Sequence, residues 1–175
     1  MKAKKGDIWV SAVLYLTLGV IAIALILAAA IPLINKIKDR NTVAQTKEVL
    51  FTLDETIRRV ANEGPGSQRE LSPFTIGTGK LVIEQELEKI AWEMETEAII
   101  QEPNTPLKEG VLTITLKEHP NIEDRYTILL ETQYTGIDLN LTSQFNNPFT
   151  GKFSVLVRHS GRFPANKPEV EIHIK

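Results

Sequence analysis

Residues 43–66 read VAQTKEVLFTLDETIRRVANEGPG, and this stretch decides the fold of the chain. Two mostly apolar series recur in it at seven-residue spacing, with an offset of three: Val43, Leu50 and Ile57, and Thr46, Leu53 and Val60. Spacings of three and four place both series on one face of a helix, and the charged residues fall mostly between them. Gly64-Pro65-Gly66-Ser67 is a stop signal. The pattern predicts an amphipathic helix over residues 36–63 that packs, after Val49, against the rest of its own chain.

The sequence before this helix is apolar on every side. No side chain between Ile8 and Asn35 is charged, and the run exceeds the roughly 20 residues that cross the hydrocarbon core of a bilayer. It therefore predicts a membrane-spanning helix over residues 7–35. Pro32 lacks a backbone donor, so a bend or a locally melted turn is expected between Ala28 and Pro32.

A cleaved secretory signal is the less favoured interpretation of the same run. Such a signal has an apolar stretch of about 7 to 15 residues that ends in small residues at the cleavage site. The alanines at 28–30 resemble that site only weakly, because they come late and Pro32 follows them. Orientation stays open, because basic residues flank both ends of the run and the positive-inside rule gives conflicting answers. These residues are Lys2, Lys4 and Lys5 before the run, and Lys36, Lys38 and Arg40 after it.

After Gly66 the periodicity of the sequence falls to two, which is typical of β-strands. In KIAWEMETEAII, residues 89–100, the residues Ile90, Trp92, Met94 and Thr96 alternate with glutamates. Further strands are expected in LVI (81–83), GVLTITLKE (110–118), RYTILLETQY (125–134), IDLNLT (137–142), GKFSVLVRH (151–159) and EVEIHIK (169–175). The expected fold class is α+β. Six or seven short strands form an antiparallel sandwich or one curved sheet packed on the helix. A linker loop is expected over 64–79 and a β-rich head domain over 80–175.

Residues that carry catalytic or metal chemistry form no recognisable pattern. His119, His159 and His173 lack a partner at ligand spacing, and an isolated histidine is most often a surface residue. No serine lies in a GxSxG elbow, and no glycine-rich loop leads from a strand into a helix. The chain has no cysteine, and its formal charge of −2 contains no basic patch suited to nucleic acid. We therefore expect no enzyme, no catalytic, cofactor-binding or metal site, no cofactor and no nucleic-acid partner.

Two surface features give weaker signals. Asn140-Leu141-Thr142 is a sequon, which makes Asn140 a candidate glycosylation site if the head is exported, although such triplets often arise by chance. The segment from Phe145 to Phe149 could form a contact loop, but an ordinary turn with core phenylalanines is the favoured interpretation.

Two segments resemble a known family. Lys5-Gly6-Asp7-Ile8 resembles the processing site of class III signal peptides in archaeal type IV pilin-like proteins, where a basic residue and a glycine precede the cut. TIRRVANEGPGSQREL, residues 56–71, resembles a segment that recurs in the same proteins. The resemblance covers residues 1–71. It implies that a membrane prepilin peptidase cuts between Gly6 and Asp7, which makes residues 1–6, with Lys4 and Lys5, a leader peptide.

The resemblance also implies a function, partners and a location. The function is that of a structural subunit of a type IV pilus-like cell-surface filament or pseudopilus. Its partners are the prepilin peptidase, identical or related subunits, an assembly ATPase, a membrane platform protein and, before assembly, the lipid bilayer. The chain would cross the membrane once, with a cytoplasmic N-terminus and an extracellular head. Helix–helix assembly is expected through Ile8, Trp9, Val13, Leu14, Leu16, Val20, Ile23 and Leu27.

The chain departs from the family pattern at one position. Many bacterial relatives carry a glutamate a few residues into the helix, where it is thought to neutralise a neighbouring terminal amine, whereas Ser11 lies in that region here. Asp7 is the acid available at this end, and the hypothesis is that it compensates a terminal charge. Two alternative functions remain open: a non-polymerising single-pass membrane protein whose head binds a ligand or partner and, more distantly, a membrane-tethered enzyme.

Overall fold

The computed structural model describes residues 5–122 and 124–175, with side chains from residue 9 onward. It contains a long helix, α1 (Lys5–Glu63), followed by a sheet of eight strands, so the expected α+β fold is confirmed. The described chain forms two compact units, one that ends at Lys38 and a second over Asp39–Lys175. We call the second unit the head and describe each unit by itself.

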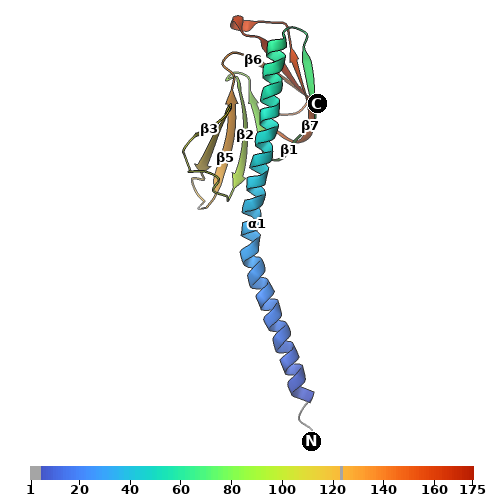
Figure 1. The fold of residues 1–175 in the computed structure, drawn as a ribbon, viewed down its shortest axis with the longest axis vertical. Helices are drawn as coiled ribbons and strands as arrows, with labels where there is room; N and C mark the ends of the chain where they lie inside the picture. The colour runs from blue at the N-terminus through green and yellow to red at the C-terminus, as the bar shows by residue number, and fades with distance from the viewer. Residues whose placement is uncertain (1–4, 123) are drawn as a thin grey trace. The chain divides into compact units, whose positions relative to one another are not determined.

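The sheet contains strands of very different length. Their bounds are β1 (Gln68–Glu84), β2 (Lys89–Thr96), β3 (Leu107–Glu109), β4 (Leu112–Glu118), β5 (Tyr126–Gln133), β6 (Asp138–Ser143), β7 (Phe149–His159) and β8 (Glu169–Ile174), with a 3-10 turn η1 (Pro164–Asn166) before β8. The strand order is β3-β4-β5-β2-β1-β7-β8-β6. All pairs are antiparallel except β6 with β8, which is parallel. Within the head the strands lie around the part of α1 that follows Asp39 (Figure 1).

The predicted helix seam forms one side of the core of the head. All six of its residues are buried, from Val60 at 0% exposed to Thr46 at 7%. The five apolar seam residues pack against apolar side chains from the sheet in one continuous cluster. A second contact of the helix involves a charged side chain. The Arg58 guanidinium pairs with Asp54 on the same helix at 2.9 Å and lies over the ring of Tyr134, which follows β5, 5.2 Å from its centroid. The prediction that this part of the helix packs on its own head is confirmed.

The two-residue alternation in the strands is also confirmed. In β2, Ile90, Trp92, Met94 and Thr96 are buried, whereas the glutamates between them face outward. Trp92 is 0% exposed, and its indole N–H donates to the Thr78 carbonyl at 3.0 Å. A buried indole needs such an acceptor, because an unpaired donor in the core costs free energy.

The expected linker over 64–79 is wrong, because β1 begins at Gln68. Proline and glycine in this segment indicated a loop. In the structure they lie in β1 at two irregularities of its pairing with β7, between Leu71 and Phe74 and between Ile76 and Leu81. Gly79 has a φ of +80°, and a Cβ there would lie 2.4 Å from the Glu93 carbonyl oxygen. Only glycine fits this close approach.

Three other details differ from the sequence-based expectation. The strands number eight rather than six or seven, because the three-residue β3 is too short to leave a periodic pattern. One pair is parallel. Helix α1 continues through Pro32, so the turn before Pro32 is not melted. The expected bend at Pro32 stays a prediction.

The outer edge of β6 is covered by side chains from the turn between β1 and β2. The Leu139 N–H donates to Glu88 Oε2 at 2.6 Å, and the Leu141 N–H donates to Gln85 Oε1 at 3.1 Å. Strand N–H groups at a sheet edge otherwise remain free to pair with another chain. The side-chain oxygens of Glu88 and Gln85 therefore accept hydrogen bonds that the carbonyls of a further strand would otherwise accept.

A buried glutamate fixes the loop between β7 and β8, residues 160–168, which we call the tip loop. Glu169 is 5% exposed. Its carboxylate accepts hydrogen bonds from the Ser160 hydroxyl at 2.7 Å and the Asn140 amide at 3.0 Å, and it forms an ion pair with the Arg162 guanidinium at 2.6 Å. Burial by itself raises the pKa of Glu169, but these three donors outweigh it and hold the pKa below its ordinary value of 4.5.

Glu169→Gln is expected to lower the melting temperature at neutral pH, because the amide keeps the shape of Glu169 but loses its charge-assisted bonds. A carboxyl whose folded pKa is lowered stabilises the fold above its unfolded pKa, and this contribution is lost as pH falls through the folded pKa. The difference in melting temperature between wild type and variant should therefore narrow from about pH 6 to about pH 3. Melting curves of both proteins across this range measure it. If the difference in melting temperature stays constant over this range, the charge of Glu169 is not what stabilises the fold.

Candidate functional site

The strongest candidate for a functional surface is the apolar part of α1, residues 9–35, which we call the apolar segment. By length and composition, α1 from Trp9 onward is able to cross a membrane. The large side chains of the segment are exposed, from Val13 at 49% to Trp9 at 76%. Apolar surface in contact with water costs about 25 cal/mol per Å². A continuous segment of this kind therefore requires lipid or other protein around it.

Most of the expected assembly residues form one stripe along this segment. Trp9, Val13, Leu16, Val20, Ile23 and Leu27 alternate in spacing between four and three residues, and each is at least 49% exposed. This is the spacing of a helix that packs lengthwise on another helix. Leu14 lies off the stripe and is also exposed, at 62%. Because the faces beside the stripe are apolar too, the segment has no side suited to water.

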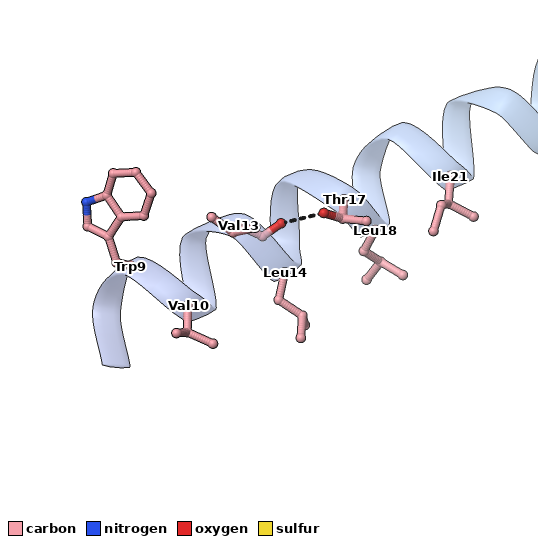
Figure 2. Close-up of a pocket in the computed structure, with 7 residues that line it drawn as sticks. All are labelled: Trp9, Val10, Val13, Leu14, Thr17, Leu18 and Ile21. Carbon is pink, nitrogen blue, oxygen red and sulfur yellow. Dashed lines mark hydrogen bonds between the residues drawn. The ribbon is translucent and has the colours of Figure 1, made fainter. Parts of the chain in front are cut away.

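Figure 2 shows the beginning of the apolar segment from Trp9 to Ile21. Its side chains point away from the helix in different directions, and a single helix encloses no cavity, so this is an open surface. The one polar side chain drawn with a hydrogen bond is Thr17, whose hydroxyl donates to the Val13 carbonyl at 2.8 Å. This bond within the helix leaves the hydroxyl satisfied in an apolar surrounding.

The residues of the expected processing site lie at the limit of the described structure. Lys4 lies outside the described residues. The backbone of Lys5, Gly6, Asp7 and Ile8 belongs to α1, but their side chains lie outside what the structure describes. The cut between Gly6 and Asp7, the leader charge and the contribution of Ile8 to assembly all stay predictions.

The histidines are not placed as a group. His159 is only 2% exposed, which corrects the expectation that it lies at the surface. Its Nδ1 accepts the Gly161 N–H at 3.0 Å, and its ring lies 5.3 Å from that of Phe163. His119, which follows β4, and His173, in β8, are half-buried. No three His, Asp or Glu side chains in the described part of the chain are arranged to hold a metal ion.

The two weaker sequence signals have specific surroundings. Phe149 is 2% exposed and packs 6.1 Å from Phe153, as the favoured core interpretation expects, but Phe145 is 54% exposed. The Asn140 amide nitrogen, to which a glycan would be attached, donates to Glu169. Its glycosylation stays a prediction and would require this bond to break.

Sequence reasoning missed the tip loop and the covered edge of β6. Both depend on contacts between distant residues, such as Glu88 with Leu139 and Asn140 with Glu169, and no local pattern marks them. Comparisons with protein-family models, with curated proteins and with solved structures gave no match.

Proposed function

We propose that this chain is a structural subunit of a type IV pilus-like cell-surface filament or of a pseudopilus. The observation that carries the proposal is the pairing of two surfaces in one chain: an apolar segment exposed on every side, and a head whose own core is already filled. The head needs no partner to bury its apolar side chains. The segment needs one along its whole length.

An apolar segment of this form suits a subunit that is surrounded first by lipid and later by other subunits. Full burial of a Val, Leu or Ile side chain is worth about 1.5–3 kcal/mol. Lipid supplies this burial before assembly, and identical helices supply it afterwards. A membrane anchor that never polymerises needs an apolar segment of the same kind, so the cut at Gly6 is what separates the two functions.

The leader residues fit the same scheme. A cut between Gly6 and Asp7 removes Lys2, Lys4 and Lys5 and takes the formal side-chain charge from −2 to −5. Cations next to a membrane span hold that end on the cytoplasmic side. Their loss removes an anchor that opposes extraction of the helix from the bilayer.

The experiment that tests the proposal is mass measurement of the native protein combined with Gly6→Val. The wild type is expected to begin at Asp7. Gly6→Val is expected to retain residues 1–6 and to lose filaments, because a branched side chain fills the position where glycine lets the peptidase approach the backbone closely. Ala3→Val is the matched control, which should be cut normally. An uncut wild type, or filaments that persist in uncut Gly6→Val, would favour a simple membrane anchor instead.

Asp7→Asn tests the role of the acid at the new N-terminus. If Asp7 compensates a terminal amine among packed apolar helices, its loss leaves an unpaired charge in a poorly hydrated place. Asp7→Asn is therefore expected to be cut normally but to assemble at least tenfold less efficiently. A tenfold change corresponds to about 1.4 kcal/mol. The ratio of filament to membrane-bound subunit measures this. Asp7→Glu is the control, and normal assembly of Asp7→Asn would contradict the hypothesis.

A further inference from the structure

The head has two chemically different surfaces that are fixed to its two ends. The first, the base surface, consists of Glu97, Ile99, Glu102 and Glu118, all exposed. It lies where α1 enters the head: Asp39 Oδ2 accepts the Thr96 hydroxyl at 2.7 Å, and the Arg40 guanidinium donates to the Ile99 carbonyl at 3.2 Å. Glu118 belongs to the same end, because it and Thr96 both pair with Tyr126. The loop that carries Glu102 lies beside this end of β4, because the Asn104 N–H donates to the Leu116 carbonyl at 2.6 Å.

The second surface, the tip surface, consists of Arg158, Arg162, Phe163 and Lys167. It lies where α1 ends. The Ser67 hydroxyl donates to the Val60 carbonyl at 2.9 Å, and the Ser67 carbonyl accepts the His159 N–H at 2.9 Å. Figure 1 shows the orange-red tip loop at the end of the head where α1 terminates, with the end of β2 at the opposite end. The rise of α1 from Asp39 to Glu63 separates the two surfaces by about 36 Å.

The two surfaces are complementary in charge. Among the described residues, no Lys, Arg or His nitrogen lies within 4.0 Å of the carboxylates of Glu97, Glu102 or Glu118. At the tip, the carboxylates of Glu169 and Glu171 lie beneath the basic groups and are 6% and 13% exposed. Arg158 and Arg162 above them are 49% and 65% exposed. The tip therefore presents cations to solvent, and the base presents three carboxylates beside the exposed guanidinium of Arg40.

Each surface also has one exposed apolar side chain. Phe163 is 54% exposed at the tip, and Ile99 is 53% exposed at the base. The backbone holds Phe163 in place, because the Arg162 N–H donates to the Ser160 hydroxyl at 3.0 Å and the Asn166 N–H to the Phe163 carbonyl at 3.3 Å. An apolar group within a charged rim is the usual anatomy of a protein–protein contact.

We propose that the tip surface of one copy docks on the base surface of the next copy, so that heads associate head to tail. Two different surfaces at opposite ends of one molecule make a heterologous contact, and such a contact extends into an open chain unless its rotation closes a ring. This inference rests on the proposed filament function and names a contact of the heads that the apolar helices do not supply. Phe163 packs near Ile99 of the next copy, and the tip cations face the base carboxylates.

The absence of cysteine from the chain allows a direct test in the full-length protein. A variant with both Phe163→Cys and Ile99→Cys is oxidised in assembled filaments and run under non-reducing conditions. A ladder of covalent oligomers is expected. Each single-cysteine variant should give monomer only, and an equal mixture of the two should give dimers that contain one of each. Phe163→Cys with Lys152→Cys, an exposed residue outside both surfaces, is the matched control and should give no ladder.

Charge exchange provides a second measurement on the same cross-link. Lys167→Glu alone, or Glu97→Lys with Glu118→Lys, should lower the yield of cross-linked oligomers about fivefold. Each change places like charges on the two docking surfaces, and an exposed ion pair contributes up to about 1 kcal/mol. All three changes in one chain should restore the yield, since the signs are again opposite. Unchanged melting temperatures show that the variants fold.

The outcomes separate the two proposals. Filaments without a tip-to-base cross-link, or with cross-links between two tips, overturn head-to-tail docking and leave the filament function standing. A wild-type chain that forms no filaments overturns the filament function, and the docking inference fails with it.

Discussion

Ile23→Asp is expected to weaken membrane insertion and to abolish filaments, although the head stays folded. Ile23 lies in the middle of the apolar segment and is 60% exposed in the isolated chain, so its side chain must face lipid or a neighbouring helix. An aspartate at the centre of a membrane helix costs about 2.5–3.5 kcal/mol. This lowers the equilibrium constant for insertion by roughly two orders of magnitude.

The measurement for Ile23→Asp is the distribution of protein between membrane and soluble fractions, followed by a count of filaments. Ile23→Val is the matched control, because it removes one methylene without adding a charge, and it should behave as wild type. The far-ultraviolet circular dichroism of the β head should remain in both variants. Normal insertion and assembly of Ile23→Asp would contradict the assignment of the segment to a membrane or filament core.

Ile57→Ala is expected to destabilise the head by about 2–5 kcal/mol, the range for truncation of a large buried aliphatic side chain. Ile57 is 0% exposed on the helix seam and belongs to the main core cluster. Its removal leaves a cavity between helix and sheet, where rigid strands prevent the walls from closing. Chemical denaturation should show an earlier midpoint with little change in slope.

Glu55→Ala is the control for Ile57→Ala. Glu55 lies on the same helix with its side chain 68% exposed and pairs with Arg59 one turn away. Exposed pairs of this kind contribute about 0.3–0.5 kcal/mol, so the variant should unfold close to wild type. A loss below about 1 kcal/mol for Ile57→Ala would show that the seam is not a principal support of the head.

The parts of the fold that follow from local spacing could be predicted from the sequence. The seam from Val43 to Val60 and the alternation in β2 each repeat at the period of their own element, and burial then follows from that period. β1 could not be predicted in full, because Pro73, Gly77 and Gly79 carry the usual signs of a loop. Their acceptance depends on irregular pairing with β7, more than 70 residues away.

The candidate site divides in the same way. The apolar segment is evident from composition, because lipid selects for hydrophobicity and not for any particular partner residue. The tip surface is not evident, because Arg162 becomes part of a surface only when β8 brings Glu169 beneath it. The charge difference between base and tip likewise appears only when the strands place Glu97 and Glu118 at one end of the sheet.

The covered edge of β6 has a consequence for heads that are crowded together. Exposed strand edges in concentrated arrays tend to recruit one another into continuous cross-β aggregates, which are very difficult to reverse. With Glu88 and Gln85 occupying the N–H groups of Leu139 and Leu141, a neighbouring head would meet this edge through side chains. Side-chain contacts dissociate readily, so in the proposed filament an array of these heads can be taken apart and its subunits returned to the membrane intact.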